Sequence, residues 1–420
     1  MFACLIWLAG NRTLHAFDID VYENKAFVDN IKTIQLFPKN YPLASPVTQL
    51  NSGEIMVLAF DDLSNERKDY YYSIVQCTFD WKPTDVFTND YLKGFSEGSI
   101  TDYDFSSGTL VPYIHYRLEI PNLDMSIIKS GNYAIVVYEN SPDNIIFTKR
   151  MMVYESIAQI EGYITAPRLV TGSDDFQQIQ FTVNHKGLAI ENAYQEVNAV
   201  ILQNDRPDNA VMGVQPLFVK GEDLQFTHNR ILDFPSGKEF RRVDIRTERF
   251  KGDGILNAEV LDSFTNYYTF TSTIRSNIAH KQERDYNGKY YIDKQERWRD
   301  DYEADYGWVY FSLAMEKPVS NANIYIYGGF NDWQITEANK MTYDISTGMY
   351  TGKLFLKQGY YNYQYVVVDE EQKILDQSLT EGNYYDTEND YTILIYYKPF
   401  TERYDRLIGV EFLNSKTNRF

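Results

Sequence analysis

Cysteine is almost absent from this 420-residue sequence, which contains only Cys4 and Cys77. Two thiols cannot form a disulfide framework or a four-cysteine zinc site, so both are excluded. Cys77 lies in the strand-like run "YYYSIVQCTFDW", with no histidine nearby in the sequence. Because a free cysteine of this kind is usually buried, we expect an inert thiol at this position.

Long apolar runs are also missing. The opening "MFACLIWLAG" is too short to span a bilayer as a helix. It resembles the hydrophobic region of a secretory signal that ends near residues 14–16, although the basic segment that precedes such a region is not there. We therefore expect residues 1–16 to be a signal-peptide remnant whose true start lies further upstream. This predicts an exported protein that does not itself cross the membrane.

Basic residues are outnumbered by acidic ones. The chain has 40 Lys and Arg against 59 Asp and Glu, which gives a net charge of −19 and a pI near 4.7. Nucleic-acid phosphates would be repelled by such a chain, so we expect no nucleic-acid partner. An anionic membrane surface is disfavoured for the same reason.

Signatures of catalysis and metal binding are lacking. The sequence contains no G-x-S-x-G, H-E-x-x-H, P-loop or G-x-G-x-x-G motif. Its five histidines are scattered and never stand at metal-ligand spacing, and His115 lies in the strand-like "YIHYRLEI", where we expect a structural hydrogen bond. We predict no enzyme, no cofactor and no metal site. Catalytic groups can be dispersed in sequence, so a hydrolase with converging carboxylates stays open.

Neighbouring carboxylates are frequent, as in Asp61 and Asp62. A glycosidase needs two carboxylates that face each other across a cleft. Adjacent residues of a strand point to opposite faces, so these doublets are poor candidates for that role. We expect them to be solvated surface charges.

Aromatic residues are abundant and indicate β structure. They make up 16% of the chain, with 36 Tyr, and such residues pack well on a pleated surface. Short apolar runs bounded by Gly, Pro, Asn and Asp recur, which is typical of strands. Helical periodicity is scarce, and residues 86–95 are the best candidate. The predicted fold class is all-β, with three consecutive Ig-like β-sandwich domains and few short helices. Strand-like runs include "IKTIQLFP" at 31–38, "IMVLAFDD" at 55–62, "NYAIVVYE" at 132–139 and "VNAVILQN" at 197–204.

Changes in composition predict the domain boundaries. A first sandwich at 17–155 is expected to end after "MMVYE", and a second follows at 156–274. Residues 275–306 are highly charged, with little periodic apolar content, and are predicted to form a connector. A third sandwich at 307–400 and a polar tail at 401–420 complete the expected organisation.

One strand of the first domain carries aromatic residues on both faces. Tyr70, Tyr72 and Ile74 share one face, whereas Tyr71 and Val75 lie on the other. A sheet face exposed to water would be polar, so the second face is predicted to pack against another domain or a partner.

Two stretches carry a family resemblance. "DYYYSIVQCTFDWKPTD" and "EGNYYDTENDYTILIYYKPFTERYDRLIGV" resemble the plug protein of the Bacteroidetes type IX secretion system, and the resemblance extends from about residue 31 to 410. It implies a periplasmic, outer-membrane-associated, non-enzymatic protein that is monomeric in its complex. Its implied partner is the translocon barrel of the outer membrane, whose periplasmic end it closes. The family supplies no interface residues to carry over.

The third domain carries a second resemblance. Its "NANIYIYGGFNDW" and the strands that follow resemble the early-set Ig-like modules that bind glycogen and starch. This implies a sugar-stacking role for Trp333 with help from Asn389. The second stacking aromatic is missing near residues 370–376, and Gln364 stands where those modules have a lysine. We therefore favour a packing or partner contact for Trp333. The alternative function is an exported carbohydrate-binding module protein of a glycan-uptake system.

Overall fold

Alternating burial shows how the sequence builds its sheets. In β2 (Ile31–Pro38), Ile31, Ile34 and Leu36 are buried while most residues between them are partly exposed. This alternation arises because successive side chains of a strand point to opposite faces, so that one face packs on a core.

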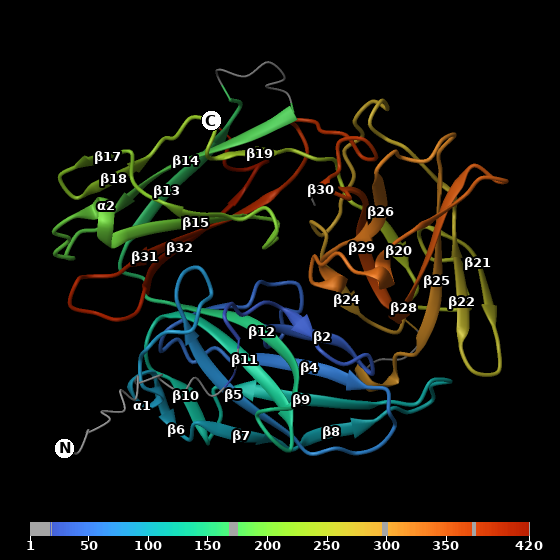
Figure 1. Cartoon of the computed structure of the whole chain (residues 1–420), viewed down its shortest axis with the longest axis horizontal. Helices are drawn as coiled ribbons and strands as arrows, with labels where there is room; N and C mark the ends of the chain where they lie inside the picture. The colour runs from blue at the N-terminus through green and yellow to red at the C-terminus, as the bar shows by residue number, and fades with distance from the viewer. Residues whose placement is uncertain (1–16, 18, 168–174, 296–300, 372–374, 420) are drawn as a thin grey trace, which may run out of the picture.

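The computed structural model describes Phe17 and residues 19–167, 175–295, 301–371 and 375–419. The signal-peptide remnant expected at 1–16, including Cys4, lies outside these residues. Figure 1 shows the strands gathered into three groups: blue to cyan below, green with red at the upper left, and yellow to orange at the right.

The first module comprises β1 to β12. Its two sheets have the strand orders β2-β4-β9-β8 and β1-β12-β11-β5-β7, with β3 parallel to β12, and a large buried cluster lies between them. A small antiparallel sheet of β6 and β10 and the single-turn helix α1 (Thr88–Tyr91) complete it. The remaining strands are β1 (Lys25–Ala26), β3 (Val47–Gln49), β4 (Met56–Asp62), β5 (Tyr70–Cys77), β6 (Leu92–Gly94), β7 (Glu97–Ile100), β8 (Asp102–Phe105), β9 (Ile114–Ile120), β10 (Met125–Ile127), β11 (Gly131–Glu139) and β12 (Ile145–Tyr154).

The second module comprises β13 to β19 together with β31 and β32. One sheet has the order β13-β14-β18-β17, with β19 on β14, and the other has the order β16-β15-β31-β32. Its core draws on both sheets. The elements are β13 (Gln159–Thr165), β14 (Phe176–Asn184), α2 (Ala193–Glu196), β15 (Val197–Gln203), β16 (Val211–Val214), β17 (Phe218–Lys220), β18 (Asp223–Phe226), β19 (Asp233–Pro235), β31 (Asp390–Tyr397) and β32 (Arg406–Asn414).

The third module comprises β20 to β30. The long strand β29 pairs with β20, β24, β26 and β30, and the facing sheet has the order β21-β22-β25-β28-β27, with β23 on β25. The elements are β20 (Arg241–Asp244), β21 (Ile255–Val260), β22 (Thr265–Thr269), β23 (Ser272–Thr273), β24 (Tyr290–Ile292), η2 (Asp301–Glu303), β25 (Tyr306–Ala314), β26 (Ala322–Tyr327), η3 (Gly329–Asn331), η4 (Glu337–Asn339), β27 (Thr342–Asp344), β28 (Met349–Lys357), β29 (Gly359–Asp369) and β30 (Leu375–Asp376).

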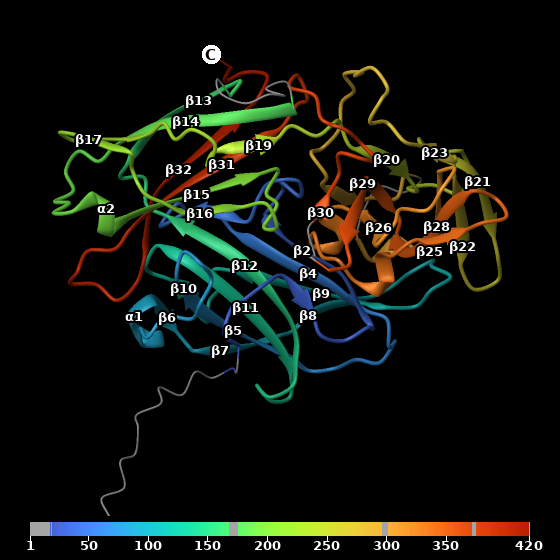
Figure 2. The same cartoon turned by 45° about the horizontal axis from the view of Figure 1, so that its top comes forward.

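The fold is all-β, as predicted, and its paired sheets are consistent with Ig-like sandwiches. The modules are not consecutive, however. The strand β31 pairs with β15 from Tyr391 to Tyr397, and β32 pairs with β31. Figure 2 shows both red strands lying among the green ones. The third module is therefore inserted within the second.

Three predicted boundaries change as a result. The strand at 390–397 belongs to the second module rather than to a sandwich at 307–400, and the expected tail at 401–420 contains the strand β32. Strands β20 to β23 pair within the third module rather than the second. Strand periodicity identifies these elements but cannot say which sheet they join, because that depends on pairing between residues far apart in sequence.

The expected connector at 275–306 is partly built into the third module. Its strand β24 pairs with β29, and Asp285 accepts a hydrogen bond from the Phe240 backbone N–H. The Asn287 side chain donates to Asp390 at 2.7 Å. High charge in this segment therefore reflects hydrogen bonding between modules as well as solvation.

Candidate functional site

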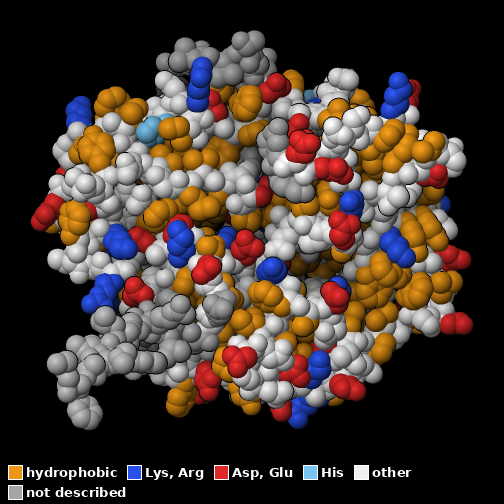
Figure 3. All heavy atoms as spheres, in the orientation of Figure 1, with side chains coloured by type: hydrophobic (Ala, Val, Ile, Leu, Met, Phe, Trp, Pro, Cys, Tyr) orange, Lys and Arg blue, Asp and Glu red, His pale blue; other side chains and the backbone are white. Residues whose placement is uncertain are grey.

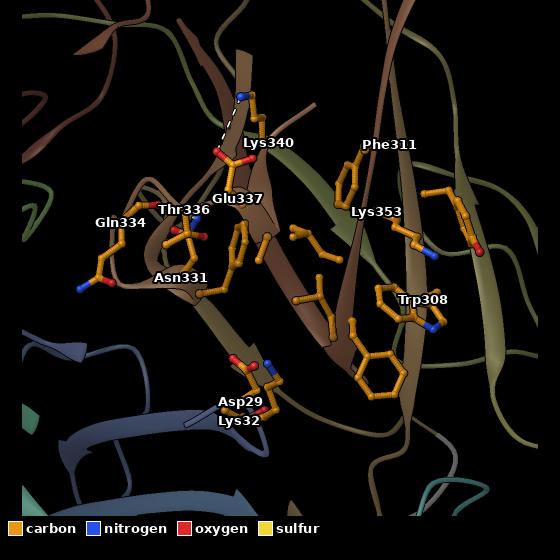
Figure 4. Close-up of a pocket in the computed structure, with 18 of the residues that line it drawn as sticks. Asp29, Lys32, Trp308, Phe311, Asn331, Gln334, Thr336, Glu337, Lys340 and Lys353 are labelled. Carbon is orange, nitrogen blue, oxygen red and sulfur yellow. Dashed lines mark hydrogen bonds and ion pairs between the residues drawn. The ribbon is translucent and has the colours of Figure 1, made fainter. Parts of the chain in front are cut away.

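A hollow of about 1050 Å³ lies between the first and third modules. We call it the β2–β28 groove, because residues 31–34 of β2 line one wall and residues 351–356 of β28 line another. Figure 4 shows Asp29 and Lys32 at its first-module end, at the bottom of the view, and Trp308 and Lys353 at the right. The turn that contains η3 and η4 forms the third wall.

Aromatic residues cover the outer sheet face beside this groove. Trp308 contacts Phe355 at a ring-centroid distance of 5.0 Å, and Tyr268 stacks on Tyr310 at 5.0 Å. The Lys353 ammonium lies 4.4 Å from the Trp308 ring centroid. Figure 3 shows hydrophobic side chains gathered at the right of the view, over this sheet. These partly exposed rings were not singled out from the sequence, although "GWVYFSLAM" places Trp308 and Tyr310 on one strand face.

Trp333 lies elsewhere, at the junction between the second and third modules, and is 9% exposed. Its ring packs edge-on against Phe240 and Tyr327, at centroid distances of 5.9 and 5.3 Å. The Arg206 guanidinium of the second module lies 5.2 Å from the ring centroid. Gly288 is so close that a Cβ there would fall 2.2 Å from the Trp333 ring. Sugar stacking requires an exposed ring, whereas the Trp333 ring is enclosed by protein.

Asn389 is 3% exposed and belongs to a hydrogen-bond network in the second module. Its side-chain amide donates to Gln177 and to the Ser236 carbonyl, and its oxygen accepts from Asn204 at 2.7 Å. None of these partners contacts Trp333 in the hydrogen bonds and ring contacts of the described residues. The structure thus does not bring the two predicted contact residues into one site.

A buried charged cluster lies at the junction of the first and third modules. Asp61 and Lys357 form an ion pair at 2.6 Å, with both side chains fully buried. The Tyr306 hydroxyl donates to the same carboxylate oxygen at 2.6 Å, and His115 Nδ1 lies 2.6 Å from the other oxygen. The Tyr113 ring lies 4.3 Å from the Lys357 ammonium. The predicted structural role of His115 is confirmed.

Burial alone would raise the pKa of the Asp61 carboxyl, but Lys357 and His115 hold that pKa below its usual value. Asp62 is buried on the opposite face, where it accepts hydrogen bonds from Asn30 and Tyr70. The expectation of solvated charge at these two positions was wrong. The two side chains do point to opposite faces of β4, as predicted, but protein covers both faces.

Two further carboxylates, at the junction of the second and third modules, have pKa values that are raised rather than lowered. Burial, with the nearby Asp285 charge, raises the pKa of Glu239 to about 7. Burial also raises the pKa of Asp285 to about 6. The Glu388 backbone N–H donates to Glu239, and His280 lies 3.6 Å from its carboxylate. These groups pack between modules and do not line the β2–β28 groove.

The first and second modules share an apolar junction. Tyr71 and Val75 pack there against a cluster that includes Val200 and Leu394 of the second module. The aromatic second face of β5 thus covers another module, which confirms the expectation for that strand. Cys77 is fully buried in the same cluster, and burial raises the pKa of its thiol to about 12.

Within the described part of the chain, no group of three or more histidine, cysteine or acidic side chains is arranged to hold a metal ion. No helix formed by the described residues is long and apolar enough to cross a membrane.

One solved structure is similar to this chain over nearly its whole length. A hypothetical protein from Parabacteroides merdae ATCC 43184, known from a crystal structure, is 32% identical, and the alignment covers 94% of this chain and 100% of that one with a TM-score of 0.90. The C-terminal domain of the Streptococcus pyogenes antigen I/II-family protein AspA is 9% identical over 91% of this chain and 99% of its own, with a TM-score of 0.16. A score that low carries no argument.

No curated protein matches the chain. A family model for the first domain of the type 9 secretion system plug protein matches residues 31–155, which span most of the first module from β2 to β12. The resemblance to glycogen-binding modules is not confirmed. Residues 31–155 thus form a first domain of the type 9 secretion system plug protein family, and this domain implies involvement in type IX secretion.

Proposed function

We propose that this protein occludes the periplasmic end of the outer-membrane translocon barrel of the type IX secretion system. It acts without catalysis, as a steric stopper. The match of residues 31–155 to the first domain of plug proteins carries this proposal. Family membership points to the cell envelope, and we infer export to the periplasm through a signal peptide.

The packing of the modules supports a stopper role. Each module contacts the other two: through the apolar cluster around Tyr71, through the Asp61–Lys357 pair, and through Trp333 and Arg206. A barrel that passes folded proteins would leak when idle, so its stopper has to resist deformation. Three modules fixed pairwise provide more stiffness than a chain of modules joined end to end.

The position of the ionisable groups supports a function without catalysis. A catalytic carboxylate needs both a shifted pKa and access to substrate. Asp61, Glu239 and Asp285 have shifted pKa values but lie packed between modules. Their arrangement fits structural junctions better than a hydrolase site. Glycan binding through Trp333 is not favoured, because its ring is buried.

The partner in this proposal is the outer-membrane translocon barrel protein, bound by one copy of this chain. Affinity isolation of the tagged full chain from detergent-solubilised envelopes is expected to recover a very large outer-membrane barrel protein. The matched control is an untagged strain carried through the same purification. Recovery of the tagged chain without such a barrel would contradict the proposal.

Loss of the stopper should also open the barrel to solutes. A deletion strain is expected to become sensitive to a large antibiotic that the intact outer membrane excludes. A barrel-deficient double mutant serves as the control and should lose that sensitivity, because the leak passes through the barrel.

A further inference from the structure

The strand β28 has an open edge. It pairs with β25 along its whole length, but on its other side only residues 349–351 pair with β27. No other described strand pairs with residues 353–356 on that side. Unpaired backbone N–H and C=O groups on a regular strand are a template for an additional strand.

This open edge lies inside the β2–β28 groove. Residues 353–356 line it, as do residues 31–34 of β2 on the facing wall. The strand β2 is also at the edge of its sheet, but its register shifts between Lys32 and Gln35, and Thr33 has a φ of +50°. Such a bulge prevents regular pairing. The edge of β28 has no such interruption and is therefore the one that can accept a strand.

The residues around the edge alternate in character. Leu354 is buried, and Leu356 and Phe330 are partly buried against the core of the third module. Lys353 and Phe355 belong to the outer face, beside Trp308. A strand added to β28 would point alternate side chains toward these two environments. Its inward residues would therefore be apolar.

The outer face beside the open edge carries an unpaired positive charge. Three lysines and three acidic residues line the groove; Lys340 pairs with Glu337 at 3.6 Å, and Asp29 lies beside Lys32 (Figure 4). Lys353 is exposed next to the edge of β28 and has no carboxylate within ion-pair distance among the described residues, so it complements an acidic side chain. The outward residues of an added strand would therefore include acidic ones.

We propose that the β2–β28 groove binds an extended segment of a partner protein as an added β-strand alongside β28, and that this segment alternates apolar with acidic residues. Main-chain hydrogen bonds to residues 353–356 supply affinity, and the alternation supplies specificity. This binding site goes beyond occlusion of the barrel and does not depend on it.

The probe is a fluorescein-labelled synthetic peptide of about eight residues, a common strand length, that alternates valine with glutamate. We expect saturable binding to the full chain by fluorescence anisotropy. Hydrogen exchange should show new protection of alternate backbone amides within residues 353–356. A peptide N-methylated at every second residue keeps its side chains but loses main-chain donors, and it should not bind.

Charge is tested by Lys353→Glu, which is expected to weaken binding about five- to tenfold through lost attraction and new repulsion. Lys317→Glu, at an exposed position outside the groove, makes the same change in net charge and should leave affinity unchanged. Absence of binding, equal binding of the N-methylated peptide, or lack of protection at 353–356 would each overturn the proposal. Such results would leave the co-purification test of barrel occlusion unaffected.

Discussion

Glu239 shows how strongly the pKa of a single side chain depends on its surroundings. It is an ordinary carboxylate in the sequence, yet burial and the Asp285 charge raise its pKa to about 7. Asp61 is more completely enclosed, but its pKa is lowered because Lys357 and His115 compensate for burial. The difference lies in the partners that each side chain meets.

Glu239→Gln should change the pH dependence of stability. The folded pKa of about 7 exceeds the ordinary 4.5, so between these values the folded state holds a proton that the unfolded state has lost. Stability therefore falls as pH rises through this window. Glutamine removes this pH-dependent contribution, on the order of 1–3 kcal/mol. Relative to the wild type, the variant's free energy of unfolding should therefore be higher at pH 8 than it is at pH 4. Urea unfolding at the two pH values measures the difference.

The matched control is Glu54→Gln, at an exposed position in the first module. Its pH profile should follow that of the wild type. Asp285, whose pKa is raised to about 6, contributes a slope of the same sign and remains in both variants. A Glu239→Gln profile that parallels the wild-type profile across the window would contradict the assignment.

Among the elements, β32 lies near the end of the chain but contributes buried side chains to the core of the second module. Its Ile408 is fully buried in the core of the second module, whereas Phe412 on the same strand is 56% exposed. The strand completes the sheet that β31 and β15 begin. The strand β32 follows the polar stretch "KPFTERYD". It thus packs in a core whose first residues lie more than two hundred positions earlier in the chain.

Ile408→Ala should therefore destabilise the protein by about 2–5 kcal/mol, because it removes buried apolar surface and leaves a cavity. Phe412→Ala removes a larger side chain from the same strand but should cost no more than about 0.5 kcal/mol. Denaturant unfolding of both variants tests the comparison. Equal losses would mean that β32 does not contribute to the core as described.

The turn that contains Trp333 is an element whose shape depends on its neighbours. Asp332 and Trp333 have φ values of +53° and +58°, in the left-handed region that bulky residues rarely occupy. Asp332 pairs with Lys149 of the first module, and Trp333 contacts Arg206 of the second. One short turn thus contacts both other modules, which offsets its backbone strain.

At the scale of the whole molecule, the Asp61–Lys357 pair fixes the first module to the third. Lys357→Met should cost about 3–5 kcal/mol, because it leaves a buried carboxylate without its cation. Calorimetry should then show the third module unfolding separately at a lower temperature, whereas we expect the wild type to unfold in one transition. A variant as stable as the wild type would show that the pair does not hold the junction.

The double variant Asp61→Asn with Lys357→Met is the control for this prediction. Asparagine keeps an acceptor for Tyr306, whose hydroxyl donates to Asp61, while it removes the unpaired charge. We expect the double variant to be more stable than Lys357→Met alone. Thermodynamic coupling between the two positions measures the interaction directly.

Much of the fold could be predicted from local pattern. The β2 strand appears at the predicted residues 31–38, and the burial of Cys77 and the hydrogen bond of His115 follow the predictions. The insertion of the third module could not be predicted, because "YTILIYYKP" reads as a strand whichever sheet receives it. The groove escaped prediction because it forms between β2 and β28, some three hundred residues apart in sequence.

The all-β class, most strand positions and the family resemblance could be read from the sequence, because these depend on residue type and short-range alternation. Tertiary structure alone decided the partners of Asp61, the burial of Trp333 and the open edge of β28. Each of these depends on which distant residues come together, and a side chain's exposure and charge state follow from those neighbours.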